Sequence, residues 1–224
     1  MKLKSIIAIT ACTAILIGAS TAVITKKQHI QERKILGVIP DLSEQELILN
    51  SDIIVEATVT NIAKSHWSNP ENIEEKRNVL QTDITLNINN LLSGEYDDKT
   101  VVVRINKGYD PESKTRVISD GYPDFSKGEH VILFLSRDDS DIATEENYFV
   151  LTGMRQGKWL INETSSRTTP SIGAGAPDTD LTEDSIESLK QTIAKEKANN
   201  PDWKEKKAQQ AEETKKINAE LFGE

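Results

Sequence analysis

The sequence predicts a mainly β protein whose central region, 43–162, folds as a small antiparallel barrel or sandwich. Several segments of this region alternate apolar and polar residues with a period of two, as half-buried strands do. Helical segments do not alternate with them, which disfavours a parallel sheet. Most of the connections are short, and a region of about 120 residues suits a small barrel.

A short helix is expected at the start of this region, followed by six strands. Ser43 can cap a helix that begins at the next residue, and Glu46 completes a capping-box pattern. The clearest alternation lies in 79–90, and the run Leu91–Gly94 is expected to break the register and turn. Strands are predicted at 52–64, 79–90, 101–106, 131–135, 148–152 and 158–161. The fourth of these is apolar on both faces and is therefore placed centrally.

One connection, 107–128, is much longer than the others. Long connections without secondary structure are usually functional or disordered, and this one carries several apolar and aromatic side chains. Tyr122, Asp124 and Phe125 are therefore candidate partner-binding residues. The alternative interpretation is a loop that folds back as a lid over the barrel end.

Charge is distributed unevenly along the chain, whose formal net charge is -9. Residues 1–34 carry a net charge of +5, residues 35–180 of -12 and residues 181–224 of -2. A domain this acidic repels phosphate backbones, so nucleic acid is not expected as a partner. It also repels anionic lipid headgroups, so the basic N-terminal segment is the part expected to face the membrane.

The N-terminal segment is expected to direct the chain to a membrane. Residues 5–24 contain no charged side chain and would form a helix of about 30 Å, the thickness of a hydrocarbon core. Three interpretations remain open: an uncleaved signal anchor, a signal peptide cut after Ala22, and a lipoprotein signal processed at Cys12. The first places the domain outside the plasma membrane on a single-pass anchor, and the second makes the protein secreted.

The remaining segments are polar. Residues 1–27 are the signal anchor or signal peptide, 28–42 a spacer, 163–180 a flexible linker rich in Ser, Thr, Gly and Pro, and 181–224 a charged helical tail. Within the tail, helices are expected to about Lys197 and over 202–221. The apolar stripe of the second helix is thin, which is typical of a solvated helix.

The run LSEQELILNSDIIVEATVTNI, followed by TDITLNINNLLSGEYDDKTVVVRI, FSKGEHVILFL and QGKW, resembles a family of uncharacterised Gram-positive envelope proteins. These elements are in turn similar to the netrin-like fold of tissue inhibitors of metalloproteinases. The resemblance covers 43–162 and implies an OB-like barrel. Inhibitors of that fold act through an N-terminal cysteine and disulfides, and Cys12 is the only cysteine of this chain, so their mechanism is not carried over.

No catalytic, metal or cofactor motif is apparent. His29, His66 and His130 stand apart and form no HExxH pattern, and His130 is interpreted as structural. The acidic run 137–141 suggests either a hard-cation site or a hairpin turn, and the turn is favoured because no 12-residue calcium loop follows. Trp159 is interpreted as a core residue.

The function expected from these observations is that of a non-catalytic extracytoplasmic envelope protein. Its barrel would display a binding module to a protein or cell-wall partner. One alternative is an envelope hydrolase that uses the loop carboxylates Asp120 and Asp124. Another is an assembly factor that acts through the C-terminal helices.

Overall fold

The computed structural model describes residues 30–35, 41–73, 78–140, 142–144, 146–161 and 183–222. The expectations for the membrane segment 5–24 and for the linker 163–180 lie outside these residues. Among the described residues, no helix has both the length and the apolar character needed to cross a membrane.

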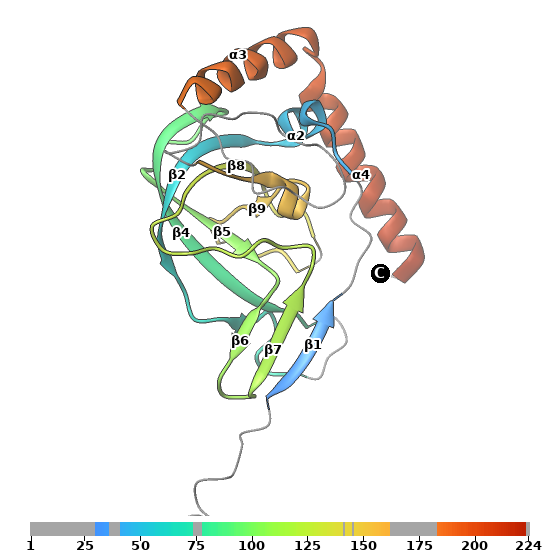
Figure 1. The fold of residues 1–224 in the computed structure, drawn as a ribbon. Helices are drawn as coiled ribbons and strands as arrows, with labels where there is room; N and C mark the ends of the chain where they lie inside the picture. Colours follow the sequence, from blue (N-terminus) through green and yellow to red (C-terminus); the bar gives the residue numbers. More distant parts are fainter. Residues whose placement is uncertain are drawn as a thin grey trace, which may run out of the picture.

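Most strands belong to one antiparallel sheet, which confirms the prediction of a mainly β protein (Figure 1). Its order is β10-β8-β2-β4-β3, with β5 paired to β4 and β9 paired to β8. The members are β2 (Ile53–Ile62), β3 (His66–Trp67), β4 (Leu80–Ser93), β5 (Thr100–Ile105), β8 (His130–Ser136), β9 (Val150–Leu151) and β10 (Lys158–Leu160).

The sheet curls strongly but its ladders do not close into a complete barrel, in contrast to the expectation from sequence. Between β5 and the chain entering β9 there is a single parallel bridge, Val103 to Phe149. The amide of Phe149 donates to the carbonyl of Val102 at 2.9 Å. The amide of Arg104 donates to the carbonyl of Phe149 at 2.8 Å.

The predicted break in register and turn over Leu91–Gly94 is confirmed, although β4 continues to Ser93 before the chain turns at Gly94. Three register shifts in the β2–β4 ladder accommodate the break in alternation within a continuous strand. Gly94 then has φ +89°, and an added Cβ would lie 2.2 Å from the carbonyl oxygen of Asp52. Glycine is therefore required at this turn by both conformation and space.

Strands β2 and β8 are buried on both faces, which confirms the central position expected for 131–135. On the inner face of the curled sheet, Val55 and Leu133 belong to the main hydrophobic cluster. On the outer face, Ile54 and Phe134 belong to a second cluster, together with residues of the helices. A side chain of this kind contributes roughly 1.5–3 kcal/mol when fully buried, so both clusters matter for stability.

The helices cover the outer face of the sheet. Helix α2 (Glu44–Asn50) begins with the expected capping box, in which Ser43 and Glu46 bond to each other's backbone amides. Helix α3 (Glu183–Asn199) adds Ile186, Leu189 and Ile193 to the outer cluster, all of them buried. Helix α4 (Trp203–Phe222) follows after a short turn and runs along the side of the domain (Figure 1). Part of the expected tail is thus integral to the core.

A second, three-stranded sheet lies at the other end of the molecule from α3 (Figure 1). Its order is β1-β7-β6, with β1 (Gln31–Ile35) parallel to β7 (Thr115–Ser119) and β6 (Gly108–Asp110) antiparallel to β7. The long connection 107–128 therefore contains a hairpin. Strand β1 lies within the range expected as a spacer, and its pairing with β7 is what makes it extended.

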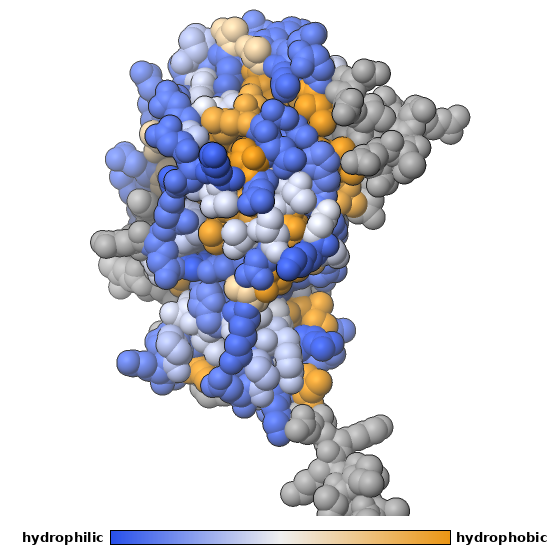
Figure 2. All heavy atoms as spheres, turned by 90° about the vertical axis from the view of Figure 1, so that its left-hand side faces the viewer, coloured by the Kyte–Doolittle hydropathy of each residue, from blue (hydrophilic) through white to orange (hydrophobic). Residues whose placement is uncertain are grey.

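The surface is mostly hydrophilic on the face shown in Figure 2, where the hydrophobic side chains form small separate groups. Among the described residues, the exposed large hydrophobic side chains are scattered over several elements. They are Ile30, Ile35, Ile62, Leu91, Ile118 and Met154. Isolated hydrophobic side chains of this kind are ordinary on a protein surface.

Candidate functional site

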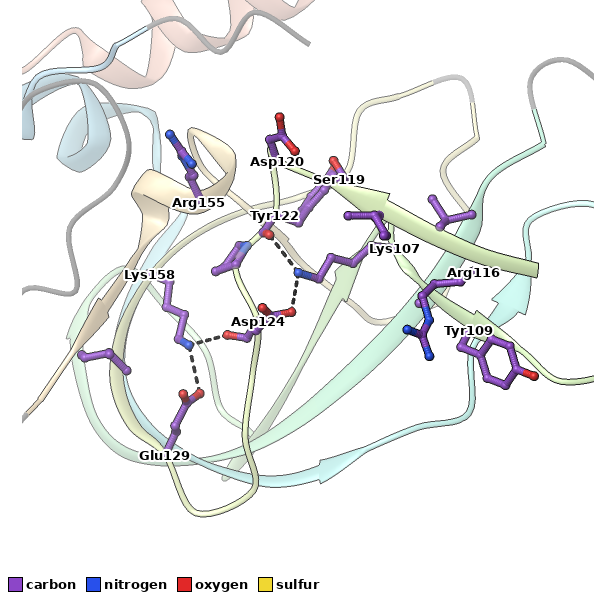
Figure 3. A pocket seen from close by; sticks show the side chains of 15 residues that line it. Lys107, Tyr109, Arg116, Ser119, Asp120, Tyr122, Asp124, Glu129, Arg155 and Lys158 are labelled. Atoms are coloured by element: carbon purple, nitrogen blue, oxygen red, sulfur yellow. Dashed lines mark hydrogen bonds and ion pairs between the residues drawn. The ribbon is translucent and has the colours of Figure 1, made fainter. Parts of the chain in front are cut away.

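A cavity of about 770 Å³ lies between the β6–β7 hairpin, the segment 119–124 and strand β10 (Figure 3). We call it the hairpin cavity. Its charged lining residues are Lys107, Arg116, Asp120, Asp124, Glu129, Arg155 and Lys158. Tyr109 and Tyr122 add aromatic surface. A cavity of this size that combines aromatic and convergent charged groups is typical of a ligand site.

Asp110 fixes the hairpin that forms one wall of the cavity. Its carboxylate accepts hydrogen bonds from the Ser113 hydroxyl at 2.6 Å, from the Trp67 indole at 2.9 Å and from the amides of Glu112 and Ser113. Burial on its own raises the pKa of Asp110, but these hydrogen bonds outweigh burial and hold the pKa at about 2. The hairpin therefore has a rigid, charged anchor at its turn.

Two lysines hold the opposite wall, the segment 121–129. The Lys158 ammonium donates to the carbonyl of Asp124 at 2.6 Å and to the Glu129 carboxylate at 2.9 Å, and it lies 4.5 Å from the Phe125 ring. The Lys107 ammonium donates to the carbonyl of Tyr122 at 3.0 Å and pairs with the Asp124 carboxylate at 2.6 Å. Figure 3 shows both side chains directed at this segment. Their charges are thus largely compensated by the loop itself.

Unlike the two lysines, the two arginines of the cavity are not paired with carboxylates of the described residues. Arg116 lies 5.6 Å from the Tyr109 ring, and the backbone amide of Arg155 donates to the Gly121 carbonyl at 2.9 Å. Within the described part of the chain, neither guanidinium has an ion pair with a carboxylate. Guanidinium groups bind carboxylate and phosphate oxygens in a bidentate manner, so each arginine could hold an anionic group of a ligand in the cavity.

The structure places the three predicted partner-binding residues at or beside the hairpin cavity. Tyr122 and Asp124 line it, whereas Phe125 lines a smaller neighbouring hollow. Tyr122 and Phe125 also pack against the main hydrophobic cluster, as expected for a lid. Burial, with a further contribution from Asp138, raises the pKa of Tyr122. Of the three, Asp124 has the most accessible side chain, which is 93% exposed.

The residues that sequence reasoning missed are the cations. Lys107 lies at the entry of β6, Arg116 in β7, Arg155 in a 3-10 helix and Lys158 at the start of β10. They are far apart in the sequence, and only the folding of the hairpin against β10 brings them together. A weak signal was present, since these are basic residues in a region with a net charge of -12.

Other candidate groups have structural roles. Within the described ranges, no three His, Cys, Asp or Glu side chains are grouped to hold a metal ion. In the acidic run 137–141, Asp138 accepts hydrogen bonds from the Ser140 amide and the Tyr148 hydroxyl, as a turn-capping residue does. His130 Nε2 lies 2.8 Å from Glu56 Oε1, in agreement with its structural interpretation.

The position of Trp159 confirms that it is a core residue. It is 6% exposed, and its ring centroid lies 4.8 Å from that of Phe134 in the outer cluster.

Comparison with known proteins adds no relative: no protein-family model matches the chain, and no curated protein matches it.

Proposed function

We propose that this chain is a non-catalytic extracytoplasmic envelope protein, held at the plasma membrane by residues 5–24, whose β domain binds a protein or cell-wall partner. The site is the hairpin cavity, and the partner presents an anionic group to it, with a carboxylate as the best match. The observation that carries the proposal is the pair of arginines, Arg116 and Arg155. Both line the cavity and lack an ion pair within the described residues.

The remaining charges of the hairpin cavity support binding more than reaction. Lys107, Lys158, Asp124 and Glu129 are paired with one another and fix the geometry of the loop. Forming these contacts in advance lowers the entropy lost when a ligand is held. The arginines then supply the directional contacts that a planar carboxylate can accept.

The fold belonging to this function is a partly open OB-type barrel. Its support is the pairing path, which runs from β8 through β2, β4 and β5, crosses the Val103–Phe149 bridge and returns through β9 to β8. A single bridge therefore connects β5 to the chain entering β9, where a complete barrel would have a ladder of several paired residues. The resemblance to envelope proteins of the netrin-like type agrees with this path.

The test is direct binding to cell walls and to acidic peptides. Purified cell walls are sedimented with full-length protein in detergent, and a glutamate-rich peptide is added as competitor. Arg116→Gln and Arg155→Gln should each weaken retention by roughly tenfold, as expected for the loss of a charge-assisted contact. Lys127→Gln, which changes an exposed cation of the same region outside the cavity, should leave retention unchanged. Equal retention of the wild-type protein and all three variants would exclude the hairpin cavity as the site.

A hydrolase remains the second candidate, because the structure brings Asp120 and Asp124 to one cavity. Paired carboxylates can act as general acid and base, but Asp124 is engaged by Lys107 at 2.6 Å. A hydrolase would release soluble fragments from an envelope polymer, and Asp120→Asn or Asp124→Asn would abolish the release. Retention of polymer without fragments supports the binding function instead.

Assembly through the C-terminal helices has less support. Ile186, Leu189 and Ile193 are the large apolar residues described in α3, and all three are buried against the sheet. They would have to leave the core to reach a partner helix. Truncation after residue 200 should therefore leave the oligomeric state unchanged, which size-exclusion chromatography with light scattering measures.

A further inference from the structure

A second cavity, of about 750 Å³, lies where α3 and α4 meet the end of β4, the residue before β2 and the chain that follows β8. We call it the helical pocket. It shares no lining residue with the hairpin cavity. Four cations line it, namely Arg137, Lys197, Lys204 and Lys207. Such a concentration of positive charge is notable in a chain whose net charge is -9.

Lys197 is the central group of the helical pocket. It is half-buried, and its ammonium donates to the Ser93 hydroxyl at 2.5 Å and lies 4.3 Å from the Trp203 ring. Among the described residues it has no ion pair with a carboxylate. Burial lowers the pKa of Lys197, and Lys204 and Lys207 lower it further, although Asp52 opposes them. The protein therefore leaves a net positive potential at this ammonium.

The carboxylates of the pocket do not remove that potential. Asp52 pairs with Lys207 at 2.5 Å and also accepts the Arg137 amide at 2.7 Å, so both of its oxygens are engaged. Glu95 and Asp139 also line the pocket, but both are exposed. Solvent and salt screen exposed charges much more than half-buried ones. Lys197, which is half-buried and unpaired among the described residues, is thus the cation of the pocket that solvent screens least.

We infer that the helical pocket binds a phosphate group, either as free phosphate or within a phosphodiester polymer. An ammonium is a compact point charge that suits phosphate oxygens, and Lys197, Lys204 and Lys207 would surround the anion on several sides. The first turns of α4 carry Lys204 and Lys207, and the N-terminal end of a helix adds a partial positive charge. A bound phosphate would supply the anionic partner that Lys197 lacks.

Isothermal titration calorimetry on the full-length protein in detergent at low salt tests this inference. The two probes are inorganic phosphate and poly(glycerol phosphate). Lys197→Met keeps an aliphatic chain against Trp203 while removing the charge, and Lys204→Gln changes an exposed residue that the fold does not need. Each should weaken binding by roughly tenfold. The matched control is Lys206→Gln, since Lys206 is 63% exposed, lies outside the pocket lining and pairs with Asp202, the residue just before α4.

The outcomes separate the sources of phosphate and test the site. Saturable binding of both probes with similar affinity per phosphate identifies the group itself as the ligand. Binding of the polymer alone identifies a phosphodiester chain, provided that Lys197→Met and Lys204→Gln weaken it and Lys206→Gln does not. The inference is overturned if neither probe binds saturably at millimolar concentration, or if all three variants bind as the unchanged protein does. Arg116→Gln should not alter phosphate binding, so this result is independent of the hairpin cavity.

Discussion

At the scale of single residues, Asp110 connects the small sheet to Trp67 of the main sheet. Its folded-state pKa of about 2 lies below the value of about 3.9 in an unfolded chain. The ionised carboxylate therefore stabilises the fold above about pH 4, and this contribution is lost as the pH falls toward 2. We expect Asp110→Asn to lower the free energy of unfolding by about 1–2 kcal/mol at pH 7.

The difference in free energy of unfolding between Asp110→Asn and the wild-type protein should shrink between pH 4 and pH 2, because protonation removes the same charge from the wild-type protein. Urea denaturation at a series of pH values measures it. Glu112→Gln, at an exposed position of the same turn, is the control. A difference that is independent of pH would contradict the role assigned to the charge.

Lys158 provides a second prediction at this scale. Its side chain is 6% exposed, and its ammonium holds both the Asp124 carbonyl and Glu129. Lys158→Met fills similar space but leaves these acceptors without their donor, which should cost roughly 1–3 kcal/mol. Hydrogen exchange should become faster in 121–129 and stay unchanged in β2. Uniform acceleration over the whole domain would instead indicate a general loss of packing.

At the scale of elements, the sequence predicts those strands that carry an alternating or a continuous apolar pattern. Strands β2, β4, β5 and β8 are of this kind. Strand β1 is not, since four of its five residues are polar or charged and its extended form depends on β7, more than 80 residues away. The short strands β3 and β6 are defined by their partners in the same way. Local patterns cannot report such distant pairing.

Helix α3 gives the prediction at this scale. Leu189 is 5% exposed in the outer cluster, so Leu189→Ala should lower the free energy of unfolding of the β domain by roughly 2–4 kcal/mol. Lys190→Ala, at the neighbouring residue on the more exposed side of the helix, should change it by less than about 0.5 kcal/mol. Thermal denaturation followed by the near-ultraviolet signal of Trp159 and the other tryptophans measures both. Equal stability of the two variants would show that α3 is an independent tail.

At the scale of the whole molecule, the small sheet and α3 lie at opposite ends of the fold. Strand β1 begins at Gln31, so if residues 5–24 span the membrane, only 25–30 separate the bilayer from the small sheet. Six extended residues reach roughly 20 Å at most, which keeps the small sheet, and the hairpin cavity formed partly by it, near the membrane surface. The sequence predicted Tyr122 and Asp124 as site residues but not the four cations of the cavity, because these come from four separate elements.

The side of the membrane on which the β domain lies is the prediction on which the proposed cell-wall partner depends. In protoplasts of a Gram-positive host that express the full chain, external protease should digest the β domain, while the protein in untreated cells stays membrane-bound at full length. A fragment released to the medium without residues 1–22 would mean a secreted protein, and soluble ligands would then be the proper probes of both cavities. Membrane-bound protein that resists external protease would place the acidic domain on the cytoplasmic side and exclude a cell-wall partner. A cytoplasmic enzyme marker that survives the treatment shows that the protoplasts remained sealed.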